Sequence, residues 1–69
     1  MKHREQIGQK IAGLRQKKGL TLKQLAEASG VTSQNLTKIE HGKYNVSIDI
    51  LTKVCLALGA EITIKEVKP

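Results

Sequence analysis

The chain has 69 residues, which suffice for one small domain and are too few for two. Twelve Lys and Arg residues stand against six Asp and Glu residues, and the net charge of +6 favours a polyanionic partner, because basic side chains on phosphates release condensed counterions. The sequence has no signal-peptide pattern and no apolar run of about 18 residues, so we expect a cytoplasmic protein that makes no contact with a membrane.

The first predicted element is a helix over about residues 4–18. Its apolar stripe, spaced i, i+4 and i+7, consists of Ile7, Ile11 and Leu14. Gly8 and Gly13 each weaken such a helix by roughly 1 kcal/mol relative to Ala, so we expect close packing by a neighbouring helix at these positions. Lys17 and Lys18 in the last turn either complement the helix dipole or contact phosphate.

Residues 21–43 predict two short helices joined by a tight turn. Thr21 and Gln24 have the spacing of a capping box at the start of the first helix, and Gly30 can adopt the left-handed conformation that ends it. Thr32 is a good N-cap for the second helix. The outer face of this helix is polar, with Ser33, Gln34, Thr37, Lys38 and His41. Two helices so arranged are typical of a helix-turn-helix.

A fourth helix is predicted from Ile48 to Leu58, with Ser47 as its N-cap and Gly59 as its C-cap. Its apolar face is broad and includes Cys55. Leu56 lies outside that face, and is either an ordinary exposed leucine or part of a subunit contact.

The last residues differ in character from the helices. Residues 60–67 are rich in β-branched side chains and alternate in polarity, which predicts a strand. A lone strand has no partner within its own chain, so we expect it to pair with the same strand of a second copy; a frayed tail is the alternative. The predicted domains are therefore 1–59, a helix-turn-helix DNA-binding domain, and 60–69, a C-terminal strand and tail for dimerisation.

The sequence offers no catalytic or metal-binding constellation. Cys55 is the only cysteine, so it excludes an intramolecular disulfide, fits a reducing compartment and is expected to be a small buried side chain. His3 and His41 have no cysteine or carboxylate at zinc-binding spacing, and no glycine-rich phosphate loop is present. We therefore expect no enzyme and no metal or other cofactor.

The spaced pattern T-x-x-x-L-A-x-x-x-G-V-x-x-x-x-[LI]-x-x-[LI]-E-x-G-K carries a resemblance to the lambda-repressor-like helix-turn-helix family of XRE or Cro/cI type. The matching residues are Thr21, Leu25, Ala26, Gly30, Val31, Leu36, Ile39, Glu40, Gly42 and Lys43. The resemblance covers about residues 7–59 and implies an all-α fold of four helices that binds duplex DNA sequence-specifically. Because of the terminal strand, the nearer resemblance is to HipB-type antitoxins and similar short regulators, which also end in a strand. Leu22 and Val46 depart from the family pattern, which commonly has Gln and Pro there.

A recognition helix from Ser33 to Glu40 would enter the major groove, with the residues at its N-terminal end against base edges. The expected base contacts are Thr32, Ser33, Gln34, Thr37 and Lys38. The resemblance places the family's base-contacting positions on Ser33, Gln34 and Lys38. The expected phosphate contacts are Thr21, Lys23, Gln24, Asn35, Lys43, Tyr44 and Asn45, with a structural role for Asn35 as the alternative.

The resemblance also pairs Arg15 with Glu40 in a partly buried ion pair that holds the recognition helix against the first helix. We expect a transcriptional regulator, in most such proteins a repressor, that binds a palindromic operator as a homodimer through Leu56, Ile62 and Ile64. One alternative is an antitoxin that binds both operator DNA and a toxin protein. Another is a protein-interaction module without DNA binding.

Overall fold

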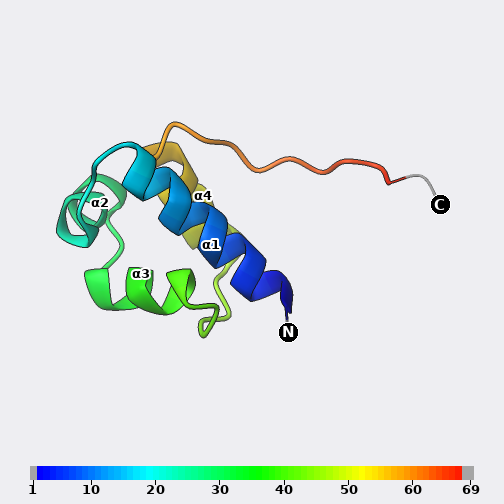
Figure 1. Ribbon diagram of the computed structural model, residues 1–69, viewed down its shortest axis with the longest axis horizontal. Coiled ribbons are helices and arrows are strands. Elements are labelled where there is room, and N and C mark those ends of the chain that lie inside the picture. The colour runs from blue at the N-terminus through cyan, green and yellow to red at the C-terminus, as the bar shows by residue number, and fades with distance from the viewer. Residues whose placement is uncertain (1, 68–69) are drawn as a thin grey trace.

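The computed structural model describes residues 2–67, in which four helices and no strand are present (Figure 1). The helices are α1 (Lys2–Lys17), α2 (Leu22–Ser29), α3 (Ser33–Glu40) and α4 (Ile48–Ala57). The prediction of an all-α, four-helix fold is confirmed. The bounds of α3 are those predicted for the recognition helix, whereas α1 begins two residues earlier than predicted and α4 ends one residue earlier.

The predicted caps position α2, α3 and α4. The hydroxyl of Thr21 accepts from the Gln24 amide at 3.1 Å, and the Gln24 side chain accepts from the Thr21 amide at 2.9 Å, so the capping box is complete. Thr32 and Ser47 likewise accept amide hydrogen bonds at the starts of α3 and α4. Gly30 ends α2 with φ of 75°, which turns the chain sharply into α3.

The core lies where all four helices meet. Its buried aliphatic side chains are Ile11, Leu25, Val31, Leu36, Ile39, Val54 and Leu58. Leu36 and Ile39 are the buried residues of α3, so burying them aims the opposite face of that helix at solvent. Cys55 is only half-buried, contrary to the expectation of full burial, and desolvation raises the pKa of its thiol.

The two glycines of α1 have different surroundings. A Cβ at Gly8 would overlap the carbonyl oxygen of Ile39 and lie 2.6 Å from that of Glu40, so α1 packs there directly on the backbone of α3. No atom lies within 4 Å of a Cβ built at Gly13, and the expectation of close packing is wrong at that position. Of the two glycines, only Gly8 therefore serves a helix contact, near the N-terminal end of α1.

The predicted strand is not present as a strand. Residues 61–67 are exposed and, among the described residues, none of them takes part in a backbone hydrogen bond. Figure 1 shows this segment as an extended tail that leaves the helices after α4. The physical reason is that a strand is defined by its ladder, and a single copy of the chain supplies no partner edge. The last two residues of the predicted tail, 68 and 69, lie outside the described residues.

The glycine contacts yield a paired test by urea unfolding. Gly8→Ala should lower the free energy of unfolding by about 1–3 kcal/mol, because the added methyl must displace the backbone of α3. Gly13→Ala should raise it by about 0.5–1 kcal/mol, because alanine loses less backbone entropy in an open helical position. Equal effects of the two substitutions would contradict the close approach at Gly8.

Candidate nucleic-acid interface

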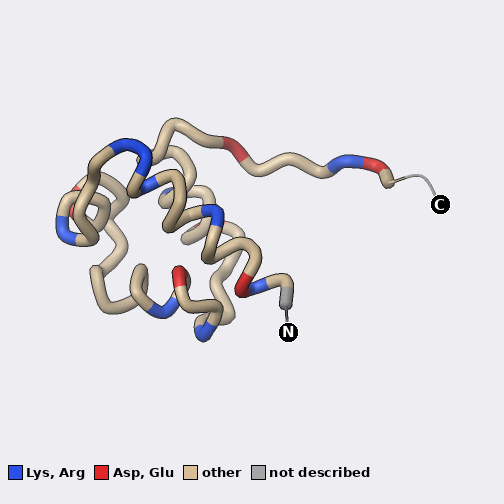
Figure 2. The backbone as a smooth tube through the Cα atoms, viewed as in Figure 1, with Lys and Arg blue, Asp and Glu red and all other residues tan. Residues whose placement is uncertain are grey.

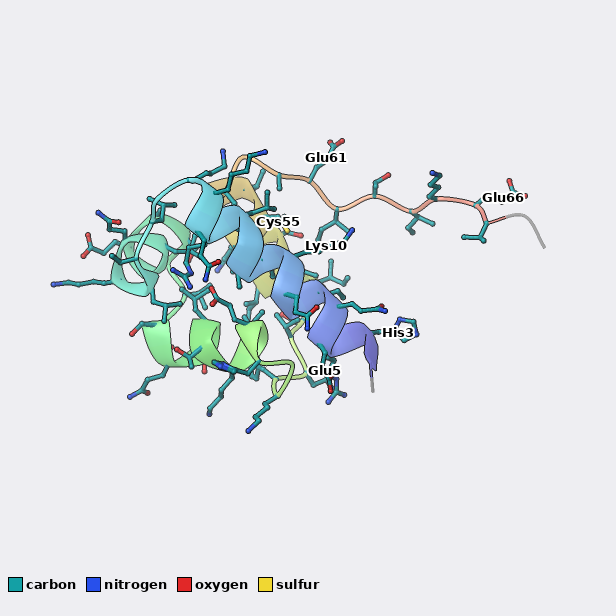
Figure 3. All side chains as sticks on the ribbon, viewed as in Figure 1. His3, Glu5, Lys10, Cys55, Glu61 and Glu66 are labelled. Carbon is teal, nitrogen blue, oxygen red and sulfur yellow. The ribbon has the colours of Figure 1, made fainter. Side chains whose placement is uncertain are left out.

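The outer face of α3 is polar and free of packing contacts with the core. Ser33, Gln34 and Lys38 are exposed, whereas Leu36 and Ile39 face inward. Figure 3 shows the side chains of α3 projecting on the side away from α1. A helix presented in this way fits the major groove, which is wide enough to admit one and displays a distinct donor and acceptor pattern for each base pair.

Two of the five predicted base contacts already have hydrogen-bond roles inside α3. The Thr37 hydroxyl donates to the Ser33 carbonyl oxygen at 2.9 Å, and the Thr32 hydroxyl accepts from the Asn35 amide at 3.2 Å. The hydroxyl proton of Thr37 is therefore not available to a base. This bond was not predicted from the sequence, although a helical threonine commonly donates to the carbonyl oxygen four residues before it.

The side chains of the other three predicted base contacts have no hydrogen-bond partner in the described part of the protein. Within residues 2–67, the side chains of Ser33, Gln34 and Lys38 form no hydrogen bond or ion pair with the protein. Gln34 has both a donor and an acceptor, as bidentate pairing with adenine requires, and Lys38 has donors only, as guanine or phosphate requires. These three exposed side chains of α3 are thus free to bind a partner.

The predicted phosphate contacts fall in two groups at opposite ends of the helix-turn-helix. At the start of α2, Lys23 is exposed, while the side chains of Thr21 and Gln24 satisfy each other in the capping box. In the loop after α3, Lys43 and Asn45 are exposed, and Tyr44 is half-buried against the core. The remaining candidate, Asn35, is half-buried in the first turn of α3.

The loop after α3 is held by backbone contacts. The amide of Lys43 donates to the carbonyl oxygen of Lys38 at 2.9 Å, and Gly42 has φ of 72°, a conformation that favours glycine. The loop therefore keeps a fixed position relative to α3. The lysines of the α1–α2 turn are remote from this loop: the Lys18 ammonium lies 3.5 Å from a Cβ built at Gly59, at the end of α4, and Figure 2 shows the basic turn on the far side of the molecule from α3.

One ion pair fixes α3 on the rest of the domain. Arg15 Nε donates to Glu40 Oε2 at 2.7 Å, and Nη2 donates to Oε1 at 3.1 Å, so the pair is bidentate. Nη1 donates to the Leu20 carbonyl oxygen at 2.9 Å, which adds the α1–α2 turn to the contact. Donating hydrogen bonds to the Glu40 carboxylate raises the pKa of Arg15, although desolvation opposes this effect. The structure thus forms the pair that the resemblance implied.

Within residues 2–67, no group of three or more His, Cys, Asp or Glu side chains is placed to hold a metal ion. None of the described helices has the length and apolar character that a membrane span requires.

A family model described as helix-turn-helix matches residues 11–65, and the chain belongs to this family. Its relatives are transcription regulators. The chain is 37% identical over 57 residues to the immunity repressor protein of Bacillus phage phi105, and 43% identical over 58 residues to the HTH-type transcriptional regulator SlrR of Bacillus subtilis. Each alignment covers 83% of this chain but only 40% and 38% of the two relatives, so the chain spans about two fifths of their length.

The fold is similar to that of a solved regulator. The crystal structure of the clp gene regulator ClgR from Corynebacterium glutamicum superposes with a TM-score of 0.82 and 44% identity, covering 86% of this chain and 76% of that chain. The predicted helix-turn-helix class is confirmed, and these likenesses support DNA-binding transcription regulation as the function of the family to which the chain belongs.

The ion pair yields a stability test. Arg15→Ala should lower the free energy of unfolding by roughly 2–4 kcal/mol, because Glu40, whose side chain is only 8% exposed, keeps its charge but loses its partner. Arg15→Met combined with Glu40→Leu should recover much of that loss. Urea unfolding measures both variants, and wild-type stability of Arg15→Ala would show that the pair contributes little.

Proposed function

We propose that the protein is a sequence-specific repressor of transcription that binds duplex DNA with α3 in the major groove. The observation that carries this proposal is the free donor and acceptor set of Ser33, Gln34 and Lys38 on a helix that is fixed by its buried face and by the Arg15–Glu40 pair. Thr32 caps the start of this helix and Thr37 lies one turn after Ser33; both would contribute their remaining acceptor sites and their methyl groups.

Phosphate contacts on both sides of α3 would set the register of the protein on the duplex. Lys23 with the capped start of α2, where Thr21 and Gln24 lie, forms one group, and Lys43, Tyr44 and Asn45 form the other. Asn35, in the first turn of α3, would be a further phosphate contact. Such contacts add affinity without sequence preference, and they make binding depend on salt.

The protein acts as a homodimer on a palindromic operator in this proposal. Leu56 is 70% exposed, and Ile62 and Ile64 in the tail are 44% and 97% exposed. The unpaired backbone of residues 61–67 can form an antiparallel ladder with a second copy, which would cover these apolar side chains. A two-fold axis would then set the separation of the two recognition helices.

The exposed apolar tail is also what an antitoxin would offer to a toxin protein. The narrower likeness to HipB-type regulators belongs to this hypothesis. A toxin that co-purified with the chain, stoichiometrically and through the tail, would favour it. A protein-interaction module without DNA binding would show no salt-dependent retention on duplex DNA, and this result would overturn the main proposal.

Base recognition can be separated from phosphate contact by mutation. Gln34→Ala should reduce discrimination by about 1–3 kcal/mol at one base pair of each half-site, because one bidentate contact is lost. Lys43→Ala should weaken binding to all sequences alike and reduce the steepness of the salt dependence by about 0.9. Binding to a library of single-base operator variants measures both effects. If Gln34→Ala kept the wild-type preference at every position, α3 would not be the recognition helix.

The dimer is tested by charge introduced into the tail. Ile62→Asp combined with Ile64→Asp should give a monomer that binds a palindromic site far more weakly, because the apolar contact is lost and like charges face each other across the axis. Thr63→Asp, on the opposite face of the same segment, should leave the dimer intact. Sedimentation measures the mass, and a doubly substituted chain that remained a dimer would move the interface to the helices.

A further inference from the structure

The first turns of α1 are held closely against the end of α3. Gly8 packs on the carbonyl oxygens of Ile39 and Glu40, and a Cβ at Gly42 would lie 2.8 Å from the Cα of Glu5. Two successive turns of α1 therefore touch the backbone at which α3 ends and the following loop begins. In Figure 3, Glu5 lies at this end of the molecule, next to that loop. The start of α1 is consequently a fixed neighbour of the predicted phosphate-contacting loop.

Arg4 is on the face of α1 that points toward α3. It precedes Gly8 by one turn, and Arg4, Gly8, Ile11 and Arg15 repeat at i, i+4, i+7 and i+11, which is one stripe of a helix. Gly8 and Arg15 both contact α3 directly. The Arg4 side chain therefore leaves α1 on the side of α3, one turn before Gly8, where the loop that starts at Gly42 runs.

The charge of Arg4 has no partner among the described residues. Its side chain is exposed, and Arg15–Glu40 is the only ion pair within residues 2–67, so neighbouring Glu5 does not hold the guanidinium. Figure 2 shows basic positions on α3, in the loop after it and at the start of α1. The neighbouring Glu5 forms no ion pair with any side chain that the structure describes.

We propose that Arg4 binds a phosphate of the DNA backbone and extends the phosphate-contacting loop onto α1. This inference rests on the proposed function, because it requires α3 to lie in the groove. Guanidinium is suited to the role, since its planar donors match two phosphate oxygens at once. The contact fixes a side chain on a helix that is already rigid, so α1 adds to the electrostatic footprint without ordering a flexible arm.

The test compares Arg4→Ala with a charge removal on the opposite face of the same helix. Lys10 lies two residues from Gly8 and borders the groove between α1 and the tail, away from α3. For the wild-type protein and each variant, the association constant K for the operator duplex that the wild-type protein prefers is measured at several salt concentrations. The slope of log K against log salt concentration is then compared. Arg4→Ala should reduce the steepness of this line by about 0.9, the value for one phosphate contact, whereas Lys10→Ala should leave it unchanged. Arg4→Lys should keep most of the wild-type slope.

A second experiment identifies the phosphate. Single methylphosphonate substitutions along the duplex remove one backbone charge at a time, and one such position should weaken wild-type binding without weakening Arg4→Ala further. Identical slopes for Arg4→Ala, Lys10→Ala and wild type, with sequence preference retained, would overturn the role of Arg4 and leave the proposed function standing. Absence of salt-dependent DNA binding by the wild-type protein would instead overturn the proposed function. Thermal unfolding of each variant checks that the exposed Arg4 is not needed for folding.

Discussion

A single guanidinium group links α3 to two other parts of the fold. Arg15 uses all three of its nitrogens, two on Glu40 and one on the Leu20 carbonyl oxygen, and thereby joins α1, the α1–α2 turn and the end of α3. The Glu40 charge alone would be unfavourable at the C-terminal end of a helix, where the dipole is negative. The bidentate pair offsets this repulsion and fixes a direction for α3, which an aliphatic contact of the same size would not do.

Close backbone packing complements the ion pair. Gly8 lets α1 pack on the last carbonyl groups of α3, two turns of α1 before Arg15. An α-helix of eight residues is too short to be stable alone in water. The ion pair, the glycine contact and the burial of Leu36 and Ile39 therefore maintain α3 as a helix as well as orient it.

Local signals made most of the fold predictable. The capping box at Thr21, the left-handed Gly30 and the N-caps depend on residues within three or four positions, and the sequence displays them directly. Features that depend on contacts between residues far apart in the sequence were harder to predict. Gly8 and Gly13 look alike in the sequence, and only the position of α3 distinguishes them. The tail was predicted as a strand from its composition, but a ladder needs a second edge that one chain lacks.

The two faces of α3 have different roles: one holds the helix on the domain, and the other is exposed. The residues that stabilise the helix, Leu36, Ile39 and Glu40, point toward the core and α1. Gln34 and Lys38 are exposed, and their side chains form no hydrogen bond or ion pair with the described residues. Substitutions on the outer face therefore cost little stability, within about 0.5 kcal/mol for an ordinary surface position. In the proposed function the outer face carries the operator preference, which could therefore vary while the buried face conserves the fold.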